Sequence, residues 1–326
     1  VPMSDGGEGL LDVVAASDPA TRRVPVEVAG PDARPRTATL LVAPDGTVVV
    51  ESADVCGLAL VPPDRRRPLE ATTYGVGQAL TAAVGLGATR IVLGLGGTAA
   101  LDGGSGALNG LGMRLRTADG GLRVGAGDLA ACRSVEPGRL RWPDGVDLLL
   151  LHDVGLPLAA AAPRFGPQKG LDAAGVARAA AGLAAWAEVL VAALPGRADP
   201  GAAGTGAAGG LGFALAAALG GRLVPGAAWV ADRVGLPDAI AGADLVLTGE
   251  GRLDATSGQG KVVGHVAGAA RARGRAVAAV VGGIGPGAED VLPAARCATA
   301  PAGSGDPAAA VRAAAATLAH RLTSVH

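Results

Sequence analysis

The chain has 326 residues, of which 49% are hydrophobic but only 2% aromatic, and its formal net charge is −1. This length exceeds one comfortable core, so two domains are expected, with cores built mainly from Ala, Val and Leu. The acidic and basic residues are interspersed along the chain, which excludes the basic surface that a nucleic-acid-binding protein would present.

The first third of the chain is predicted to begin with a glycine loop that opens a helix over residues 5–16. Alternating apolar residues between turn signals then predict an antiparallel meander of three strands. These strands are expected at residues 23–29, 37–42 and 47–51. A helix over residues 72–86 and a strand over residues 90–95 follow.

The rest of the chain alternates between buried strands and Ala-rich helices. Strands are expected at residues 147–151, 243–248 and 275–281, and helices at residues 172–194, 207–219 and 261–273, with a last helix closing the chain. Residues 195–206, rich in Pro, Gly and Ala, are the best candidate for a loop or hinge. This alternation predicts an α/β architecture with parallel sheets covered by helices on both faces.

The cysteines and the hydropathy of the chain bear on the cellular compartment in which the protein is expected. The three cysteines lie far apart without a CxxC motif, which favours a reducing cytoplasm over a disulfide framework or a zinc site. We find no run of 18 residues apolar enough to predict a membrane span. The run Arg65-Arg66-Arg67 follows two prolines and is interpreted as a solvent-exposed loop.

Only two of the 28 basic residues are lysines, and both lie in glycine-flanked loops. They are Lys169, in Phe165-Gly-Pro-Gln-Lys-Gly170, and Lys261, in Gly258-Gln-Gly-Lys261. A compact ammonium suits a phosphate held in a tight backbone cradle better than a planar guanidinium does. The lysines therefore favour phosphate handling, against the alternative that they fall in loops by chance.

Three predicted strands end in glycines and acids. The first ends in Gly94-Leu-Gly-Gly-Thr98 with Asp102 beyond it, the second in His152-Asp153, and the third in Gly249-Glu-Gly with Asp254 beyond it. Ligands bind beyond the carboxyl ends of strands in open α/β sheets, and glycines let backbone N–H groups approach an anion. Carboxylates would repel phosphate unless Mg²⁺ intervened, so the combination favours Mg-nucleotide chemistry.

Other nucleotide sites fit less well. The chain has no GxxxxGK[ST] motif, which excludes a P-loop. Gly94-x-Gly96-x-x-Ala99, with Asp119 further on, matches the dinucleotide fingerprint, a weak signal in a chain this rich in glycine. His152 is a catalytic alternative, although a His at the end of an apolar strand is more often structural.

In this order, the motifs resemble the class I glycerate kinases over essentially the whole length. The matching segments are Asp5-Gly-Gly-Glu-Gly9, Thr73-Tyr-Gly-Val-Gly77, Gly94–Thr98, Asp102-Gly-Gly104, Phe165–Gly170, Gly206-Ala-Ala-Gly-Gly210, 244–254 and Gly260-Lys261. The family begins with a further strand–loop–helix unit of roughly 30 residues, including a loop lysine, that would precede Val1.

The resemblance implies an α/β fold of two domains with parallel or mixed sheets flanked by helices. Residues 1–60 and 236–326 would form a Rossmann-like discontinuous domain, and residues 61–235 an inserted flavodoxin-like domain, with the active site in the cleft between them. The implied reaction is phosphorylation of D-glycerate by Mg-ATP to 2-phosphoglycerate in the cytoplasm. No nucleic acid or membrane partner is implied, and a homodimer is left open.

The resemblance also implies roles for individual residues. Asp102 would position or deprotonate the substrate hydroxyl, while Lys169 and Lys261 would neutralise phosphate oxygens or the substrate carboxylate. The expected nucleotide-binding residues are Gly94, Gly96, Gly97, Thr98, Gly249, Glu250, Gly251 and Asp254. The expected substrate-binding residues are Asp5, Glu8, Gln168, Gly209 and Gly210, and the expected metal ligands are Asp153 and Glu250.

Two positions depart from the family's pattern, because Leu101 and Leu156 replace asparagines. Each lost amide would remove hydrogen bonds worth about 1–3 kcal/mol to a polar substrate. Two alternatives therefore stay open, namely a kinase for another small hydroxy acid and a catalytically impaired binding protein.

Overall fold

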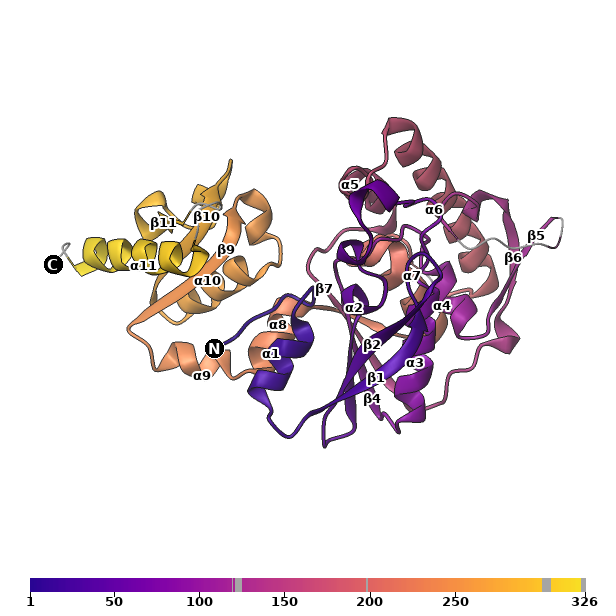
Figure 1. Cartoon of the computed structure of the whole chain (residues 1–326), viewed down its shortest axis with the longest axis horizontal. Coiled ribbons are helices and arrows are strands. Elements are labelled where there is room, and N and C mark those ends of the chain that lie inside the picture. The colour runs from indigo at the N-terminus through magenta and orange to yellow at the C-terminus, as the bar shows by residue number, and fades with distance from the viewer. Residues whose placement is uncertain (119, 121–124, 198, 301–305, 324–326) are drawn as a thin grey trace. The chain divides into compact units, whose positions relative to one another are not determined.

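The computed structural model describes residues 1–118, 120, 125–197, 199–300 and 306–323. The chain divides into two compact units, one of residues 1–5 and 227–326 and the other of residues 6–226 (Figure 1). We call the first the terminal unit and the second the central unit.

A mixed six-stranded sheet forms the middle of the central unit, in the order β1-β2-β3-β4-β7-β8. Its strands are β1 (Arg22–Ala29), β2 (Pro35–Val42), β3 (Thr47–Glu51), β4 (Arg90–Leu95), β7 (Asp147–His152) and β8 (Arg222–Pro225). The first three strands pair antiparallel, as the alternating pattern predicted, and the others pair parallel. The α/β prediction is thereby confirmed.

The domain boundaries differ from those predicted after residue 60 and before residue 236. Strand β3 pairs with β4 from Thr47 opposite Arg90 to Glu51 opposite Gly94. The meander and the later strands therefore share one hydrogen-bonded sheet and one core, and a cut at residue 60 would pass through both. The terminal unit takes only residues 1–5 from the start of the chain.

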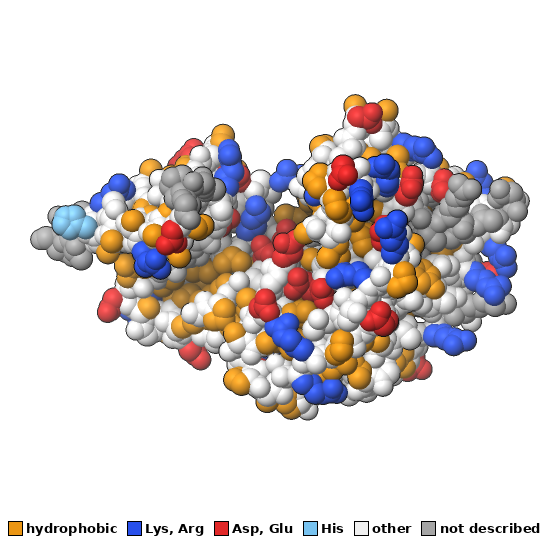
Figure 2. All heavy atoms as spheres, in the orientation of Figure 1, with side chains coloured by type: hydrophobic (Ala, Val, Ile, Leu, Met, Phe, Trp, Pro, Cys, Tyr) orange, Lys and Arg blue, Asp and Glu red, His pale blue; other side chains and the backbone are white. Residues whose placement is uncertain are grey.

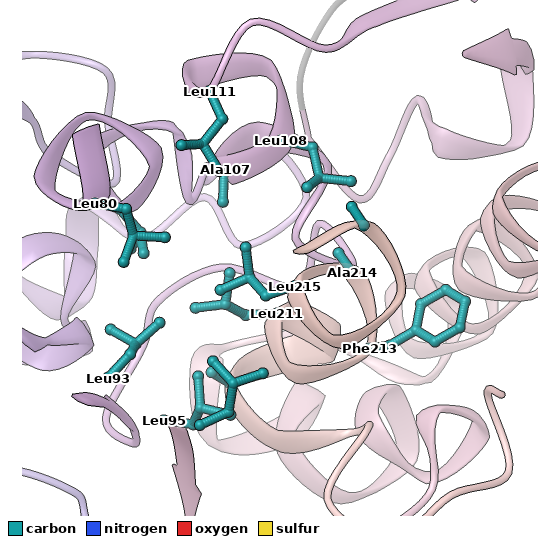
Figure 3. Packing of buried hydrophobic residues seen from close by; sticks show 14 of the residues in the cluster. Leu80, Leu93, Leu95, Ala107, Leu108, Leu111, Leu211, Phe213, Ala214 and Leu215 are labelled. Atoms are coloured by element: carbon teal, nitrogen blue, oxygen red, sulfur yellow. The ribbon is translucent and has the colours of Figure 1, made fainter. Parts of the chain in front are cut away.

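Helices cover both faces of the central sheet. They are α1 (Leu10–Ser17), α2 (Ser52–Cys56), α3 (Tyr74–Gly85), α4 (Ser105–Gly110), α5 (Ala161–Lys169), α6 (Ala173–Ala193) and α7 (Ala207–Leu219). On one face, Leu93 and Leu95 of β4 pack with Leu211 and Leu215 of α7 in the main core (Figure 3). On the other face Leu10 of α1 lies over β4. Alternate strand residues thus face two buried layers, as expected for a covered sheet.

Helix α6 is long and apolar enough to cross a membrane by length and composition alone, contrary to the sequence prediction. One such helix is weak evidence, because a core helix passes the same test. Leu183, Trp186 and Leu190 form a buried stripe along it and belong to the main core. The helix packs beside a two-stranded hairpin of β5 (Arg114–Thr117) and β6 (Cys132–Glu136), which was not predicted from the sequence.

The terminal unit contains a three-stranded parallel sheet in the order β11-β10-β9. Its elements are α8 (Gly226–Arg233), α9 (Leu236–Ala241), β9 (Leu245–Leu253), α10 (Val262–Ala272), β10 (Ala276–Ile284), β11 (Cys297–Thr299) and α11 (Pro307–Thr323). Val263 and Val266 of α10 pack against one face of the sheet, and Leu318 of α11 packs against the other. Strand β9 is an edge strand, and Leu247 on it is 54% exposed.

Charged side chains of both signs are interspersed on the face shown in Figure 2. No large field of one sign is seen among the described residues on that face. On this face, recognition of a charged ligand would therefore depend on local arrangements of a few residues.

Candidate active site

Lys169 is the last residue of α5, which ends at Gly170 in the left-handed conformation with φ 103°. Its side chain is almost fully buried, at 2% exposure. The Nζ atom donates to the carbonyl oxygen of Ala100 at 2.6 Å and to Oγ1 of Thr98 at 3.3 Å. Burial lowers the pKa of Lys169 to about 8, while the charge of Asp102 opposes this shift. A buried ammonium bonded to two neutral oxygens retains attraction for an anion.

A cavity of about 110 Å³ opens beside this ammonium, and we call it the Lys169 cavity. It is lined by Leu58, Leu95, Gly96, Gly97, Thr98, Asp153, Phe165, Gln168, Lys169, Ala208 and Gly209. The cavity therefore brings together residues from four separate motifs. They were predicted to bind the nucleotide, the substrate or the metal ion, or to act in catalysis. Phe165 and Ala208 were not singled out, although each lies inside a quoted motif.

The backbone around the Lys169 cavity adopts conformations that favour glycine. Gly97 has φ +66°, and at the start of α7 the residues Ala208, Gly209 and Gly210 have φ 52°, 69° and 94°. Because three successive residues adopt the left-handed backbone conformation, α7 does not begin with a regular helical turn. Ala208 bears the steric strain that a Cβ incurs in this region, about 1–2 kcal/mol. Strain of this kind is typical of sites where backbone must face a ligand.

Gly209→Ala should lower the free energy of unfolding by about 3 kcal/mol and deform the Lys169 cavity. A Cβ at Gly209 would lie 2.3 Å from the carbonyl oxygen of Ala100, in addition to the strain of its φ of +69°. Gly220→Ala is the matched control, because Gly220 has φ +70° but nothing within 4 Å of its Cβ position. It should cost only about 1–2 kcal/mol. Urea unfolding of both variants measures the difference, and equal losses would contradict the close contact.

Three predicted binding glycines are explained by chain packing. A Cβ at Gly94 would lie 2.3 Å from the carbonyl oxygen of Gly6, and one at Gly96 would lie 2.6 Å from Cα of Gly7. A Cβ at Gly210 would lie 2.7 Å from Cα of Gly103. These glycines let two stretches of backbone meet, so their presence carries no information about a ligand.

Glu8 and Gly97 are neighbours. An ideal Cβ at Gly97 would lie 3.1 Å from Oε1 of Glu8, and Glu8 is exposed. The Asp5–Gly9 motif thus approaches the Gly94–Thr98 loop through Glu8. Its position beside Gly97 is the observation that keeps Glu8 as a candidate for substrate binding.

Asp102 has a position that disagrees with its predicted catalytic role. Its side chain is fully buried, and its carboxylate accepts hydrogen bonds from the backbone N–H groups of Thr73 (2.8 Å), Gly104 (3.1 Å) and Gly106 (3.2 Å). The Thr73 hydroxyl also donates to it, at 2.9 Å. Burial raises the pKa of Asp102, and these hydrogen bonds lower it. The carboxylate joins the starts of α3 and α4, and it has no exposed surface with which to contact a substrate.

In the terminal unit, Asp5, Gly249, Glu250 and Lys261 line a cavity of about 600 Å³ along β9. Gly249 and Gly251 lie inside β9, which pairs with β10, so the predicted loop is a continuation of the strand. Close packing accounts for the glycine at this position, because a Cβ at Gly249 would lie 2.4 Å from the carbonyl oxygen of Val280 on the paired strand. Lys261 precedes the first turn of α10 as its N-cap residue.

Glu250 is a candidate ligand for a cation. Its Oε1 atom is buried and has no hydrogen-bond partner among the described residues. Burial raises the pKa of Glu250, the hydrogen bond with the Ser257 side chain and the charge of Lys261 lower it, and the charges of Asp254 and Asp5 raise it. An orphaned carboxylate oxygen next to a cavity fits a bound cation.

Asp254 has a local structural role. Its Oδ1 accepts from the backbone N–H of Thr256 at 2.9 Å and from the Thr256 hydroxyl, while its own N–H donates to Oγ of Ser257 at 3.1 Å. This is a capping box at the short 3-10 helix Ala255–Gly258. The Thr256 hydroxyl and N–H hold the pKa of Asp254 below its usual range.

The two expected metal ligands, Asp153 and Glu250, belong to different units. The part of the chain that the structure describes contains no group of three or more His, Cys, Asp or Glu side chains placed to hold a metal ion. A single carboxylate still fits Mg²⁺, which commonly takes one or two carboxylates together with waters and phosphate oxygens.

His152 is buried at the end of β7, where burial lowers its pKa. A Cβ at Gly204 would lie 2.5 Å from its ring, so the imidazole is enclosed by the chain and a structural role is favoured. Asp119, the acid of the dinucleotide alternative, lies outside the described residues.

The chain resembles proteins of one family over its entire length. Residues 1–326 match the model of the glycerate kinase family. A glycerate kinase from Halalkalibacterium halodurans is 36% identical over 298 residues, which cover 90% of this chain and 78% of the relative. The glycerate 2-kinase of Escherichia coli K12 is 37% identical over 294 residues, which cover 87% of this chain and 76% of that enzyme's length.

A solved structure agrees with these relatives. A protein from Salmonella typhimurium LT2, assigned as glycerate kinase 2, has a TM-score of 0.77 and 31% identity, with 98% of this chain and 89% of that chain covered. An uncharacterized protein from Mycobacterium bovis is 38% identical over 276 residues, which cover 83% of this chain and 66% of its own length.

Proposed function

The chain belongs to the glycerate kinase family, and we propose that it transfers the γ-phosphoryl group of ATP to D-glycerate, giving 2-phosphoglycerate. The observation that carries this proposal is the buried ammonium of Lys169 at the wall of a cavity lined by Gly96, Gly97 and Thr98. Phosphoryl transfer requires positive charge and positioning more than covalent chemistry, because its transition state is loose.

Within this proposal, Lys169 neutralises charge on the transferring phosphoryl oxygens, and Gly97 and Gly209 leave room for them beside the backbone. The ammonium is already held in place by its bonds to Thr98 and Ala100, so little ordering is needed when the phosphate binds. Lys261 and Glu250 serve the nucleotide phosphates. Glu250, with its orphaned carboxylate oxygen, is the proposed ligand of Mg²⁺, which when bound would supply further positive charge to the phosphate oxygens. Asp153, which lines the Lys169 cavity in the other unit, is the second candidate ligand.

The alternative of a less polar substrate is not favoured. Leu101, one of the two residues that suggested it, is fully buried in the main core of the central unit. Neither Leu101 nor Leu156 lines the Lys169 cavity. Their apolar side chains therefore do not make this cavity apolar.

The direct test is to incubate the purified protein with Mg²⁺, ATP and D-glycerate. We expect ATP-dependent formation of 2-phosphoglycerate, which ³¹P NMR distinguishes from 3-phosphoglycerate by the position of the phosphate. A protein that binds ATP but phosphorylates no hydroxy acid would contradict the proposal and favour the impaired binding protein. A cytoplasmic location is part of the proposal, and the three cysteines, all free and buried, agree with it.

A further inference from the structure

A second cavity of about 170 Å³ in the central unit shares Lys169 and Leu58 with the Lys169 cavity. We call it the arginine cavity. It is lined by Pro31, Asp32, Ala33, Leu58, Val61, Arg65, Arg66, Arg67, Pro68, Glu70, Ala71, Ala99 and Lys169. Of the three arginines predicted to lie on a solvent-exposed loop, Arg65 and Arg67 are exposed and Arg66 is half-buried, and all three line this cavity together with the buried Lys169.

Positive charge exceeds negative charge in the arginine cavity. Its lining includes three arginines and Lys169 but only two acidic residues, Asp32 and Glu70. Asp32 also lies 3.6 Å from the guanidinium of Arg34, which offsets its charge. A cavity with this balance favours an anion over a neutral or cationic ligand.

Arg66 is the best placed of the three arginines. Its Nε donates to the carbonyl oxygen of Val61 at 3.3 Å, and its two terminal nitrogens have no partner among the described residues. Arg67, by contrast, donates from Nη1 to the carbonyl oxygen of Arg66 at 2.9 Å. Arg66 is therefore held at Nε and keeps its two terminal nitrogens as donor atoms for a ligand.

We propose that the arginine cavity binds the carboxylate of the hydroxy-acid substrate, with Arg66 as its principal partner. The inference rests on the proposed function and adds the residue that recognises the acid. A guanidinium can donate two parallel hydrogen bonds to a carboxylate, which fixes its orientation as well as its position. Because Lys169 lines both cavities, a substrate held at Arg66 would direct its hydroxyl end toward Lys169.

The test compares Arg66→Ala and Arg66→Lys with the unmodified protein in steady-state kinetics. For Arg66→Ala we expect KM for D-glycerate to rise roughly 10–100-fold, with kcat and KM for ATP changed little. Arg66→Lys should recover only part of this loss, because an ammonium cannot make the paired bonds. Arg133→Ala is the control, since Arg133 is exposed and bonds to the backbone oxygens of Ala130 and Cys132.

Calorimetric titration with D-glycerate separates this proposal from the proposed function. If the unmodified protein binds D-glycerate without turnover and Arg66→Ala loses that binding, the kinase proposal fails and the carboxylate site stands. If Arg66→Ala matches the unmodified protein in KM and affinity, the site is overturned while the kinase stands. A rise in KM for ATP alone would also overturn it, because the cavity would then serve the nucleotide.

Discussion

Lys169→Met should lower kcat for glycerate phosphorylation by about 10²–10³-fold while the protein stays folded. The substitution keeps an unbranched side chain of similar size but removes the ammonium from the wall of the Lys169 cavity. Removing one preorganised charge from a transition-state site commonly has an effect of this size. The measurement is kcat from ADP release at saturating ATP and D-glycerate, with Arg133→Ala as the control for loss of a positive charge outside the cavity.

Lys169→Met should lower activity without lowering the free energy of unfolding. The pKa of Lys169 in the folded protein, about 8, is below its ordinary value of 10.5, so the unfolded chain binds this proton more readily. The stability of the unmodified protein should then rise from pH 8 to 10.5 as the unfolded state loses that advantage. Lys169→Met removes this dependence and should be at least as stable at pH 7. A variant that unfolds would contradict this expectation.

The same pKa predicts the pH profile of the enzyme. If the ammonium form acts, kcat/KM should fall as pH rises through about 8, because Lys169 loses its proton in the free enzyme. A bound anion favours the charged form, so the fall in kcat should occur at higher pH. A profile of kcat/KM that is flat from about pH 7 to 9.5 would contradict the role of Lys169.

Much of the fold could be predicted because periodicity is a local property. The meander over β1 to β3 and the strand β4 follow from alternation and from apolar runs between turns. The boundary expected after residue 60 differs from the observed one because strand pairing is not local. Nothing in β3 itself shows that it pairs with β4, which follows it only after a long intervening segment. The hairpin of β5 and β6 was missed because its strands are short and polar.

The site was predictable only where a residue type is rare. Lys169 stands out because lysine is rare in this chain, and the structure places it at a cavity. Glycines and acids are ambiguous, since Gly94 and Gly96 serve backbone packing and Asp254 caps a short helix. Arg66 was hidden in a charged run of the kind usually found in solvent, and only the folded loop shows it beside a cavity.

Asp102→Ala should lower the free energy of unfolding by about 3–5 kcal/mol. It removes a buried carboxylate and leaves the N–H groups of Thr73, Gly104 and Gly106 without their acceptor. Asp172→Ala is the matched control, because Asp172 caps α6 through a single bond to the N–H of Gly175. That change should cost about 1 kcal/mol. Denaturant unfolding measures both.

Activity then decides between structural and catalytic roles for Asp102. A structural carboxylate predicts that kcat per folded molecule stays within about threefold of the unmodified enzyme under conditions where Asp102→Ala is folded. Loss of a general base would instead lower kcat by about 10²–10⁴-fold. A variant of normal stability with such a loss would restore the catalytic role. Asp102 is fully buried and accepts hydrogen bonds at the starts of α3 and α4. We therefore expect Asp102→Ala to lower the free energy of unfolding and to leave kcat nearly unchanged.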